Sequence, residues 1–294
     1  MSEQKFKTVI TSKHRFFNLH IRETFKYRDL IWLFVKRDFT ALYKQTILGP
    51  LWALIQPVLT TFVFSFIFGT IAGLTTGDIS GTFNVPSFLF YMTGTMLFTY
   101  FSTNVSKVSK IFIDNRQTMG KVYYPRFVQP IAASLSNLIP FVINFFLFLV
   151  VWIVFLCTGT TDMHATWWLC FIPLIVLELI VLSMGLGMII SAVTTKYRDL
   201  QMLVGFGLQL WQYASPVAYG LYLISGSAKI GKYLLLYTCI NPLTPIVTTF
   251  RLAMFGFGYF DWISYVVSWG ISIFVFFLGL ILFSKTEKNF MDTI

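Results

Sequence analysis

Long apolar runs without charged residues dominate this chain. Five runs lack Asp, Glu, Lys and Arg altogether, and a sixth, residues 167–195, contains only Glu178. A helix needs about 20 apolar residues to cross a hydrocarbon core about 30 Å thick, and each run is long enough. The pattern therefore predicts an all-α integral membrane protein with six transmembrane helices. We place these spans at about residues 48–72, 88–106, 128–157, 167–194, 200–221 and 262–284.

Two shorter apolar runs lie between the fifth and sixth predicted spans. Residues 233–240 and 246–257 are each too short to cross a bilayer comfortably, and runs of this length favour re-entrant or interfacial helices. Asn241-Pro242 and Pro245 separate the two runs as a turn. A seventh and an eighth span are the alternative, which the length of the runs disfavours. We expect short re-entrant helices between spans five and six.

Residues 26–46 have the pattern of an amphipathic helix that lies in the membrane surface. An apolar arc faces away from Asp29, Lys36, Arg37 and Lys44, although Asp38 and Leu33 fall on the wrong faces. This pattern is typical of an interfacial helix, and the charged flank of a first span is the alternative. The apolar arc consists of Tyr27, Leu30, Ile31, Phe34, Val35, Ala41 and Leu42.

Two proline positions shape the entry into the first span. Gly49-Pro50 is expected to end the interfacial helix and turn the chain into the bilayer, because proline cannot continue the backbone hydrogen-bond ladder. Pro57 lies inside the first span, where a kink is tolerated if neighbouring groups satisfy the freed carbonyl.

The composition agrees with a membrane domain. Mean hydropathy is +0.72, 56% of residues are hydrophobic and only 12% are charged, whereas a soluble domain carries about 25% charged residues. We expect a cytoplasmic N-terminal segment, residues 1–25, followed by a single membrane domain over residues 26–294.

Lys and Arg are distributed unevenly around the six spans. Nineteen of the 22 fall in segments that share one side of the membrane: residues 1–46, 107–127, 196–199 and the tail after 284. Excess Lys and Arg mark the cytoplasmic side, so both termini are expected to be cytoplasmic. The net charge of +10 is explained by this bias and by contact with anionic membrane lipid. The charge therefore needs no nucleic-acid partner to explain it, and we expect none.

The sequence offers no convincing nucleotide, metal or catalytic site. Gly226–Lys232 has the spacing of a phosphate-binding loop, but Tyr233 follows it where Ser or Thr would hold magnesium. The 12 acidic residues are scattered, and the three His share no metal-ligand spacing. We therefore expect a transport subunit, not an enzyme, without a cofactor or metal of its own. The alternative, a membrane-embedded glycosyl- or phosphotransferase, would need clustered acids or a metal site.

Glu178 is the only acidic residue predicted deep within a span. A charge there costs at least about 2.5 kcal/mol on insertion scales. The side chain is therefore expected to face protein or water with a partner, or to be protonated. We favour a structural hydrogen bond to a neighbouring helix, with nearby Ser183 as the candidate partner, over a role in proton coupling.

Several short motifs together resemble a known family. Tyr43-Lys44-Gln45 is followed by Leu48-Gly49-Pro50-Leu51-Trp52 and Pro57, and a basic loop separates spans two and three. Later motifs are Trp211 with Ser215-Pro216-Val217, and Asn241-Pro242-Leu243 followed by Arg251. In order and spacing these resemble the permease subunit of ABC-2 type polysaccharide exporters, which carry O-antigen, capsule and teichoic acid chains. The chain departs from that pattern at Leu42-Tyr43, where the family usually has an Arg-Tyr pair.

The resemblance implies a function, a location and partners. It implies ATP-driven export of a lipid-linked, O-antigen-like polysaccharide across a bacterial cytoplasmic (inner) membrane. The partners would be two copies of a cytoplasmic ATP-binding subunit, which carry the ATP and Mg, and a second copy of this chain, because six helices are too few to enclose a wide pore. An ABC-2 exporter of a lipid or drug is the alternative, and neighbouring glycosyltransferase genes would favour polysaccharide.

The resemblance also assigns roles to two loops. It implies that the basic 107–127 loop is a coupling helix seated on the ATPase, and a solvated loop on the positive side is the alternative. Because a charged rim suits a transient interface, we select Lys110, Asp114, Arg116 and Lys121 as contact residues. It further implies that the short helices between spans five and six gate the pore exit, where we select Asn241, Pro242 and Arg251.

Aromatic residues, 19% of the chain, suggest a path for sugars. Sugar rings stack their C–H faces on aromatic planes, and few fixed charges let a polymer slide. Ordinary membrane packing is the alternative for any single ring. The selected path residues are Trp52, Phe62, Phe66, Trp211, Tyr213 and Tyr219.

Two pairs of glycines concern helix packing. Gly185-x-Gly187 and Gly205-x-Gly207 offer small surfaces for close contact between helices.

Overall fold

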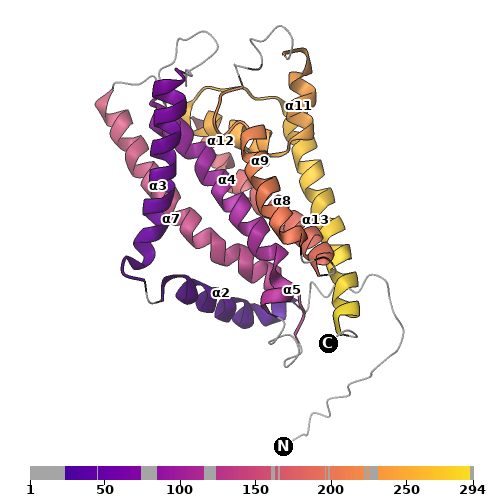
Figure 1. The fold of residues 1–294 in the computed structure, drawn as a ribbon. Coiled ribbons are helices and arrows are strands. Elements are labelled where there is room, and N and C mark those ends of the chain that lie inside the picture. The colour runs from indigo at the N-terminus through magenta and orange to yellow at the C-terminus, as the bar shows by residue number, and fades with distance from the viewer. Residues whose placement is uncertain are drawn as a thin grey trace, which may run out of the picture.

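The computed structural model describes most of the chain as a bundle of helices (Figure 1). The described residues are 24–44, 46–73, 85–115, 124–159, 163–164, 166–195, 197, 199–221, 224 and 231–291. Within these ranges every regular element is helical, which confirms the predicted all-α class for this part of the chain. The α-helices are α2 (Arg28–Tyr43), α3 (Trp52–Phe64), α4 (Ser87–Ser109), α5 (Ile111–Asp114), α7 (Val128–Thr158), α8 (Ile172–Thr194), α9 (Leu200–Ala214), α11 (Leu234–Ile240), α12 (Leu243–Phe255) and α13 (Trp262–Met291).

Four helical segments are long and apolar enough to cross a membrane. They are Trp52–Ile71, in which a π-helix (Ser65–Ile71) continues α3, then Val128–Thr158, Trp167–Thr194, in which a 3-10 turn (Trp167–Phe171) precedes α8, and Trp262–Thr286. All four coincide with predicted spans. The chain is thus a multi-pass membrane protein by the length and apolarity of these helices.

Helix α4 runs through the middle of the bundle. It covers the predicted span 88–106 but is richer in Thr, Ser and Asn than the other long helices. It packs against α3, α7 and α8, and most of its residues are buried (Figure 1). A helix surrounded by protein does not need an apolar surface toward lipid, so its polar residues can bond to neighbouring helices.

Helix α9 is shorter than the fifth span predicted from the sequence. The prediction ran to residue 221, but the helix ends at Ala214, and Ser215 has extended backbone angles. The cause is Pro216, because a residue before proline is driven out of the α region. At 1.5 Å per residue the helix is about 22 Å long, less than a hydrocarbon core. The following residues, Ser215–Ala218, are buried without being helical.

Helix α2 lies across one end of the bundle, nearly perpendicular to the long helices (Figure 1). Its buried residues Ile31, Phe34 and Val35 pack against α5 and α7, so much of the predicted apolar arc faces protein instead of lipid. Tyr27 and Leu42 from the same arc are exposed. The helix also ends at Tyr43, before the predicted Gly49-Pro50 break.

The short helices α11 and α12 lie together at the opposite end from α2 (Figure 1). They agree with the two short apolar runs of the sequence, and Asn241-Pro242 joins them. Helix α12 is buried along nearly its whole length against α4, α8 and α13. Helix α13 then begins after Asp261, whose carboxylate accepts hydrogen bonds from the Ser264 hydroxyl and backbone N–H. These bonds lower the pKa of Asp261.

Candidate functional site

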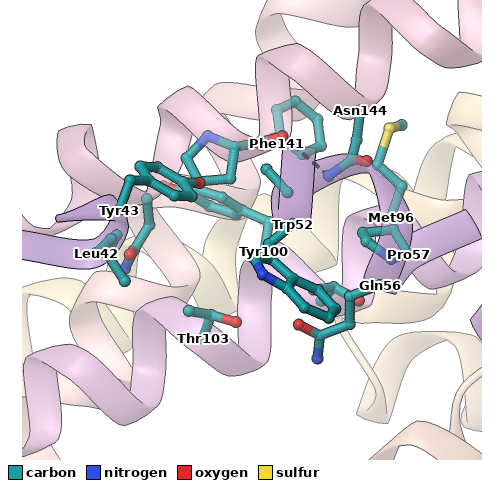
Figure 2. A pocket seen from close by; sticks show the side chains of 14 residues that line it. Leu42, Tyr43, Trp52, Gln56, Pro57, Met96, Tyr100, Thr103, Phe141 and Asn144 are labelled. Atoms are coloured by element: carbon teal, nitrogen blue, oxygen red, sulfur yellow. Dashed lines mark hydrogen bonds between the residues drawn. The ribbon is translucent and has the colours of Figure 1, made fainter. Parts of the chain in front are cut away.

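A pocket of about 320 Å³ opens between the end of α2 and helices α3, α4 and α7 (Figure 2). The lining combines aromatic rings with uncharged polar side chains, and none of the fourteen lining residues is charged. They are Leu42, Tyr43, Trp52, Ala53, Gln56, Pro57, Met96, Thr99, Tyr100, Thr103, Asn137, Pro140, Phe141 and Asn144.

Helical spacing explains how the sequence places these side chains together. Met96, Thr99, Tyr100 and Thr103 recur at intervals of three and four along α4, and Asn137, Pro140, Phe141 and Asn144 do the same along α7. Residues with this spacing share one helix face. Two such polar and aromatic stripes inside apolar helices were the signal that the sequence predictions missed.

The amides of the pocket have unused hydrogen-bonding capacity. Asn144 Nδ2 donates to the Pro140 carbonyl, drawn as a dashed line in Figure 2, while its Oδ1 has no partner within the described structure. On α3, Gln56 follows Trp52 by one turn, and both are exposed at the pocket. A carboxamide can donate and accept at once, so such groups suit a ligand that carries many hydroxyls.

Only one of the six predicted path residues, Trp52, lines this pocket. Phe62 lies further along α3 and Phe66 in the π-helix that continues it, and the two exposed rings stack with centroids 6.5 Å apart. Tyr213 is exposed on α9. These rings are therefore not gathered into one site by a single chain.

The other two path residues, Trp211 and Tyr219, make structural contacts near the short helices. Trp211 Nε1 donates to Asn241 Oδ1 at 3.0 Å, and its ring packs edge-on against Phe101. The Tyr219 hydroxyl is hydrogen-bonded to that of Tyr237 at 2.9 Å. Both residues thus contact the region around the predicted exit gate.

Asn241 joins the end of α9 to the start of α12. Its Nδ2 donates to the carbonyl of Ala214 and to the hydroxyl of Ser215. Its Oδ1 accepts from the backbone N–H of Leu243, and this bond fixes the turn before α12. The buried amide therefore uses both of its ends, which is what a polar group in an apolar environment requires.

Arg251 of α12 is buried, and its donors face backbone carbonyls instead of a carboxylate. The guanidinium lies 3.7 Å from the centroid of the Phe90 ring, and the shortest hydrogen bond, 2.7 Å, goes to Pro216. The full set of acceptors is the carbonyls of Pro216, Val217, Tyr219 and Phe90 and the hydroxyl of Thr93. Arg251 thereby ties the non-helical chain after α9 to α4 and α12.

A glycine on α4 makes room for this arrangement. A Cβ atom at Gly94 would lie 2.9 Å from both Arg251 Nη2 and the Val217 carbonyl oxygen. The three elements therefore approach one another more closely than a side chain would allow.

Comparisons with known proteins agree with this architecture. Residues 29–255 match the family described as ABC-2 type transporter. The chain belongs to this family. It is 26% identical over 275 residues to the O-antigen export system permease protein RfbA of Myxococcus xanthus, covering 93% of this chain and 98% of the relative. A Klebsiella pneumoniae protein of the same name is 28% identical, covering 90% and 94%. The polysialic acid transport protein KpsM of Escherichia coli is 27% identical, covering 87% and 93%.

The predicted coupling segment of this ABC-2 type transporter is partly described. Lys110, just before the short helix α5, and Asp114, at its end, are exposed. Ile111 and Phe112 of the same helix are buried against the bundle. Arg116 and Lys121 lie outside the described residues. Helix α5 is therefore a short rod held to the bundle by its apolar face.

An ion pair that the sequence predictions missed joins α2 to this segment. Asp38, noted as misplaced on the apolar face, lies 2.9 Å from Lys107 Nζ and 2.8 Å from Arg37 Nη2. Lys107 also donates to the hydroxyl of Ser136 on α7. Asp38 and Lys107 together thus link α2, α4 and α7 at the end of the ABC-2 domain that carries α2.

Glu178 has a different partner from the one predicted. Its Oε1 lies next to the hydroxyl of Ser268 on α13, whereas Ser183 bonds to Asn104 and to the Leu179 carbonyl. Ser183 is on the same helix, five residues on, and so faces another direction.

Proposed function

We propose that this chain is the permease subunit of an ATP-driven exporter of a lipid-linked, O-antigen-like polysaccharide in a bacterial cytoplasmic membrane. The observation that carries the proposal is the family match over residues 29–255, together with relatives that align over nearly their whole length and are named for O-antigen and polysialic acid transport. The uncharged aromatic pocket supports the same substrate class.

The pocket suits a sugar for physical reasons. Rings such as Trp52, Tyr100 and Phe141 offer flat apolar faces to sugar C–H groups, while Gln56 and Asn144 can exchange hydrogen bonds with hydroxyls. Because none of the lining residues is charged, each sugar would bind weakly enough to move on. The exposed rings of Phe62, Phe66 and Tyr213 would extend this path, whereas Trp211 and Tyr219 would position the exit.

The proposed topology has six spans with both termini in the cytoplasm. The spans would be α3 with its π-helical extension, α4, α7, α8, α9 with the chain after it, and α13. Helices α11 and α12 would be re-entrant from the outer side, with Asn241, Pro242 and Arg251 at the exit gate. The length of α12, about 20 Å at 1.5 Å per residue, supports this depth.

A second copy of the chain would complete the conduit. Only 6% of the apolar window over Trp52–Ile71 is buried within one chain, against 39% for Trp167–Thr194. Gly205 and Gly207 of α9 also have open space around them, unlike Gly185 and Gly187. The exposed faces of α3 and α9 are therefore available to line a path and to meet a partner across a two-fold axis.

Two cytoplasmic ATP-binding subunits would drive transport. Lys110, just before α5, and Asp114, at its end, offer the charged rim of a transient interface. Lys107, in the last turn of α4 next to α5, pairs with Asp38 of α2 and donates to Ser136 of α7, so a movement of α5 would pass through the end of α4 to both helices. ATP and Mg would be held by the partner, and ATP binding would shift the population from closed to open states.

The purified chain is expected to hydrolyse no ATP. The reason is that catalysis would reside on the ATP-binding subunit, so phosphate release in nanodiscs should rise from background only when that subunit is added. Robust phosphate release by this polypeptide alone, insensitive to removal of trace ATPases, would contradict the assignment.

Replacing Trp52 with alanine is expected to slow export roughly two- to twelvefold, since a stacking contact contributes about 0.5–1.5 kcal/mol. Trp52→Phe should retain most of the rate. Trp167→Ala, an exposed tryptophan outside the pocket, serves as the matched control. Surface glycan measured over time reports the rate, and equal rates for Trp52→Ala and wild type would exclude the pocket from the path.

Deletion of the gene tests the substrate class directly. Lipid-linked polymer should accumulate inside the deletion strain, and surface glycan should disappear until the gene is restored. Normal surface glycan with no internal polymer would instead favour a lipid or drug as the exported molecule.

A further inference from the structure

Glu178 is fully buried in the second turn of α8, away from the pocket. Its Oε1 lies 2.5 Å from Ser268 Oγ on α13, and its Oε2 has no hydrogen-bond partner within the described structure. An ionised carboxylate in such a place would leave one charged oxygen without any donor, which is among the most costly arrangements in an apolar medium.

No cation compensates Glu178 among the described residues. The helices packed against α8 include α4, α7, α9, α12 and α13, and none of their described side chains forms an ion pair with it. Arg251, on α12, directs its donors to carbonyls and to Thr93. Among the described residues, the titratable group that interacts electrostatically with Glu178 is the uncharged phenol of Tyr265, one turn before Ser268 on α13.

The hydrogen bonds around Ser268 determine where the protons lie. Ser268 Oγ is within hydrogen-bonding distance of two oxygens, Glu178 Oε1 and the Pro242 carbonyl at 2.9 Å. A carbonyl and an ionised carboxylate only accept, and a hydroxyl has one proton to donate. With an ionised Glu178, one of the two contacts would bring oxygens together with no hydrogen between them.

We propose that Glu178 is a neutral carboxylic acid that donates its proton to Ser268, which in turn donates to the Pro242 carbonyl. Each of the two contacts of Ser268 then contains its own hydrogen. Oε2 of Glu178 becomes the uncharged carbonyl oxygen of the acid. The relay joins α8 and α13 to the turn that begins α12. Glu178 is thus a positioning residue for that turn, an assignment of function that rests on the proposed exit gate.

The protonation state can be measured without any transport assay. In nanodiscs at neutral pH, the infrared difference spectrum of wild type minus Glu178→Gln should contain the carbonyl stretch of a protonated carboxylic acid. Asp29→Asn, which removes an acid with a 98% exposed side chain, is the control and should remove carboxylate bands only. Carboxylate bands in the Glu178→Gln difference would overturn the proposal.

Export assays then test the positioning role. Glu178→Gln should export at a rate within about twofold of wild type, because its amide N–H can replace the acid as donor to Ser268. Glu178→Leu and Ser268→Ala should lower export at least tenfold. A folded but inactive Glu178→Gln chain would overturn the relay, since that result is expected of a group that must gain and lose a proton. If wild type exports no polysaccharide, the proposed function fails, while the infrared band still decides the protonation state.

Discussion

Replacing Arg251 with leucine is expected to abolish export and to lower the apparent melting temperature of the purified chain by roughly 10 °C. A hydrogen bond to a charged group contributes about 1.5–3 kcal/mol, and carbonyls left without donors add a desolvation cost. Loss of a buried charged network therefore costs about 3–5 kcal/mol, and each kcal/mol shifts the melting temperature by about 2–4 °C in a chain of this size. Pro216 and Val217 would lose the donors that hold them against α4.

Two further variants separate charge from geometry at this position. Arg251→Lys keeps the charge, but an ammonium cannot reach several acceptors with a planar fork, so an intermediate melting temperature is expected. Arg28→Leu removes an arginine whose side chain is 85% exposed and should leave both stability and export unchanged. Thermal unfolding followed by fluorescence checks all three variants. A wild-type melting temperature for Arg251→Leu would mean that the carbonyls find other donors. The hydrogen bonds of Arg251 would then not be needed for stability.

Replacing Gly279 with alanine is the second substitution with a large expected effect. A Cβ at Gly279 would collide with the backbone carbonyl of Gly185, and a Cβ at Gly185 would lie 2.7 Å from the backbone of Phe276. Helices α8 and α13 would have to move apart along their extensive contact. Overpacking typically costs about 1–3 kcal/mol, and a clash with backbone places this change at the upper end. The apparent melting temperature should fall by several degrees.

Gly270 on the same helix provides the matched control. A Cβ there meets nothing within 4 Å, so Gly270→Ala should be neutral or slightly stabilising, because alanine favours helices over glycine by about 0.5–1 kcal/mol. The apparent melting temperatures of both variants and of wild type are measured in the same detergent and compared. Equal melting temperatures would show that the close crossing of α8 and α13 is not required.

The membrane character and most helix positions could be predicted because they depend on local pattern. Runs such as 128–157 and 262–284 have too few charges to be anything but buried or in lipid, and the structure places long helices there. The short helices before and after Asn241 were also predictable, since Pro242 interrupts two apolar runs of insufficient length. The early end of α9 at Ala214 could have been predicted from Pro216 but was not.

The site could be predicted only in part, because partners distant in the chain decide each side chain's role. Trp52 was selected from its aromatic ring and lies in the pocket, but Trp211 was selected for the same reason and is held by Asn241. Tyr100 and Asn144 were missed, although their helical spacing was visible. Asp38 was recognised as anomalous, but only its neighbour Lys107, 69 positions away, explains it.

Local physical chemistry, readable from residue order, set the helical class, the multi-pass character and the asymmetry of positive charge. These properties follow from transfer free energies and backbone propensities, which act on each segment separately. Tertiary packing alone decided that α2 turns its apolar stripe toward α7, that Arg251 binds carbonyls, and that Glu178 meets Ser268. Those outcomes depend on which surfaces come within hydrogen-bonding distance, and contacts across 35 to 90 residues leave no local pattern.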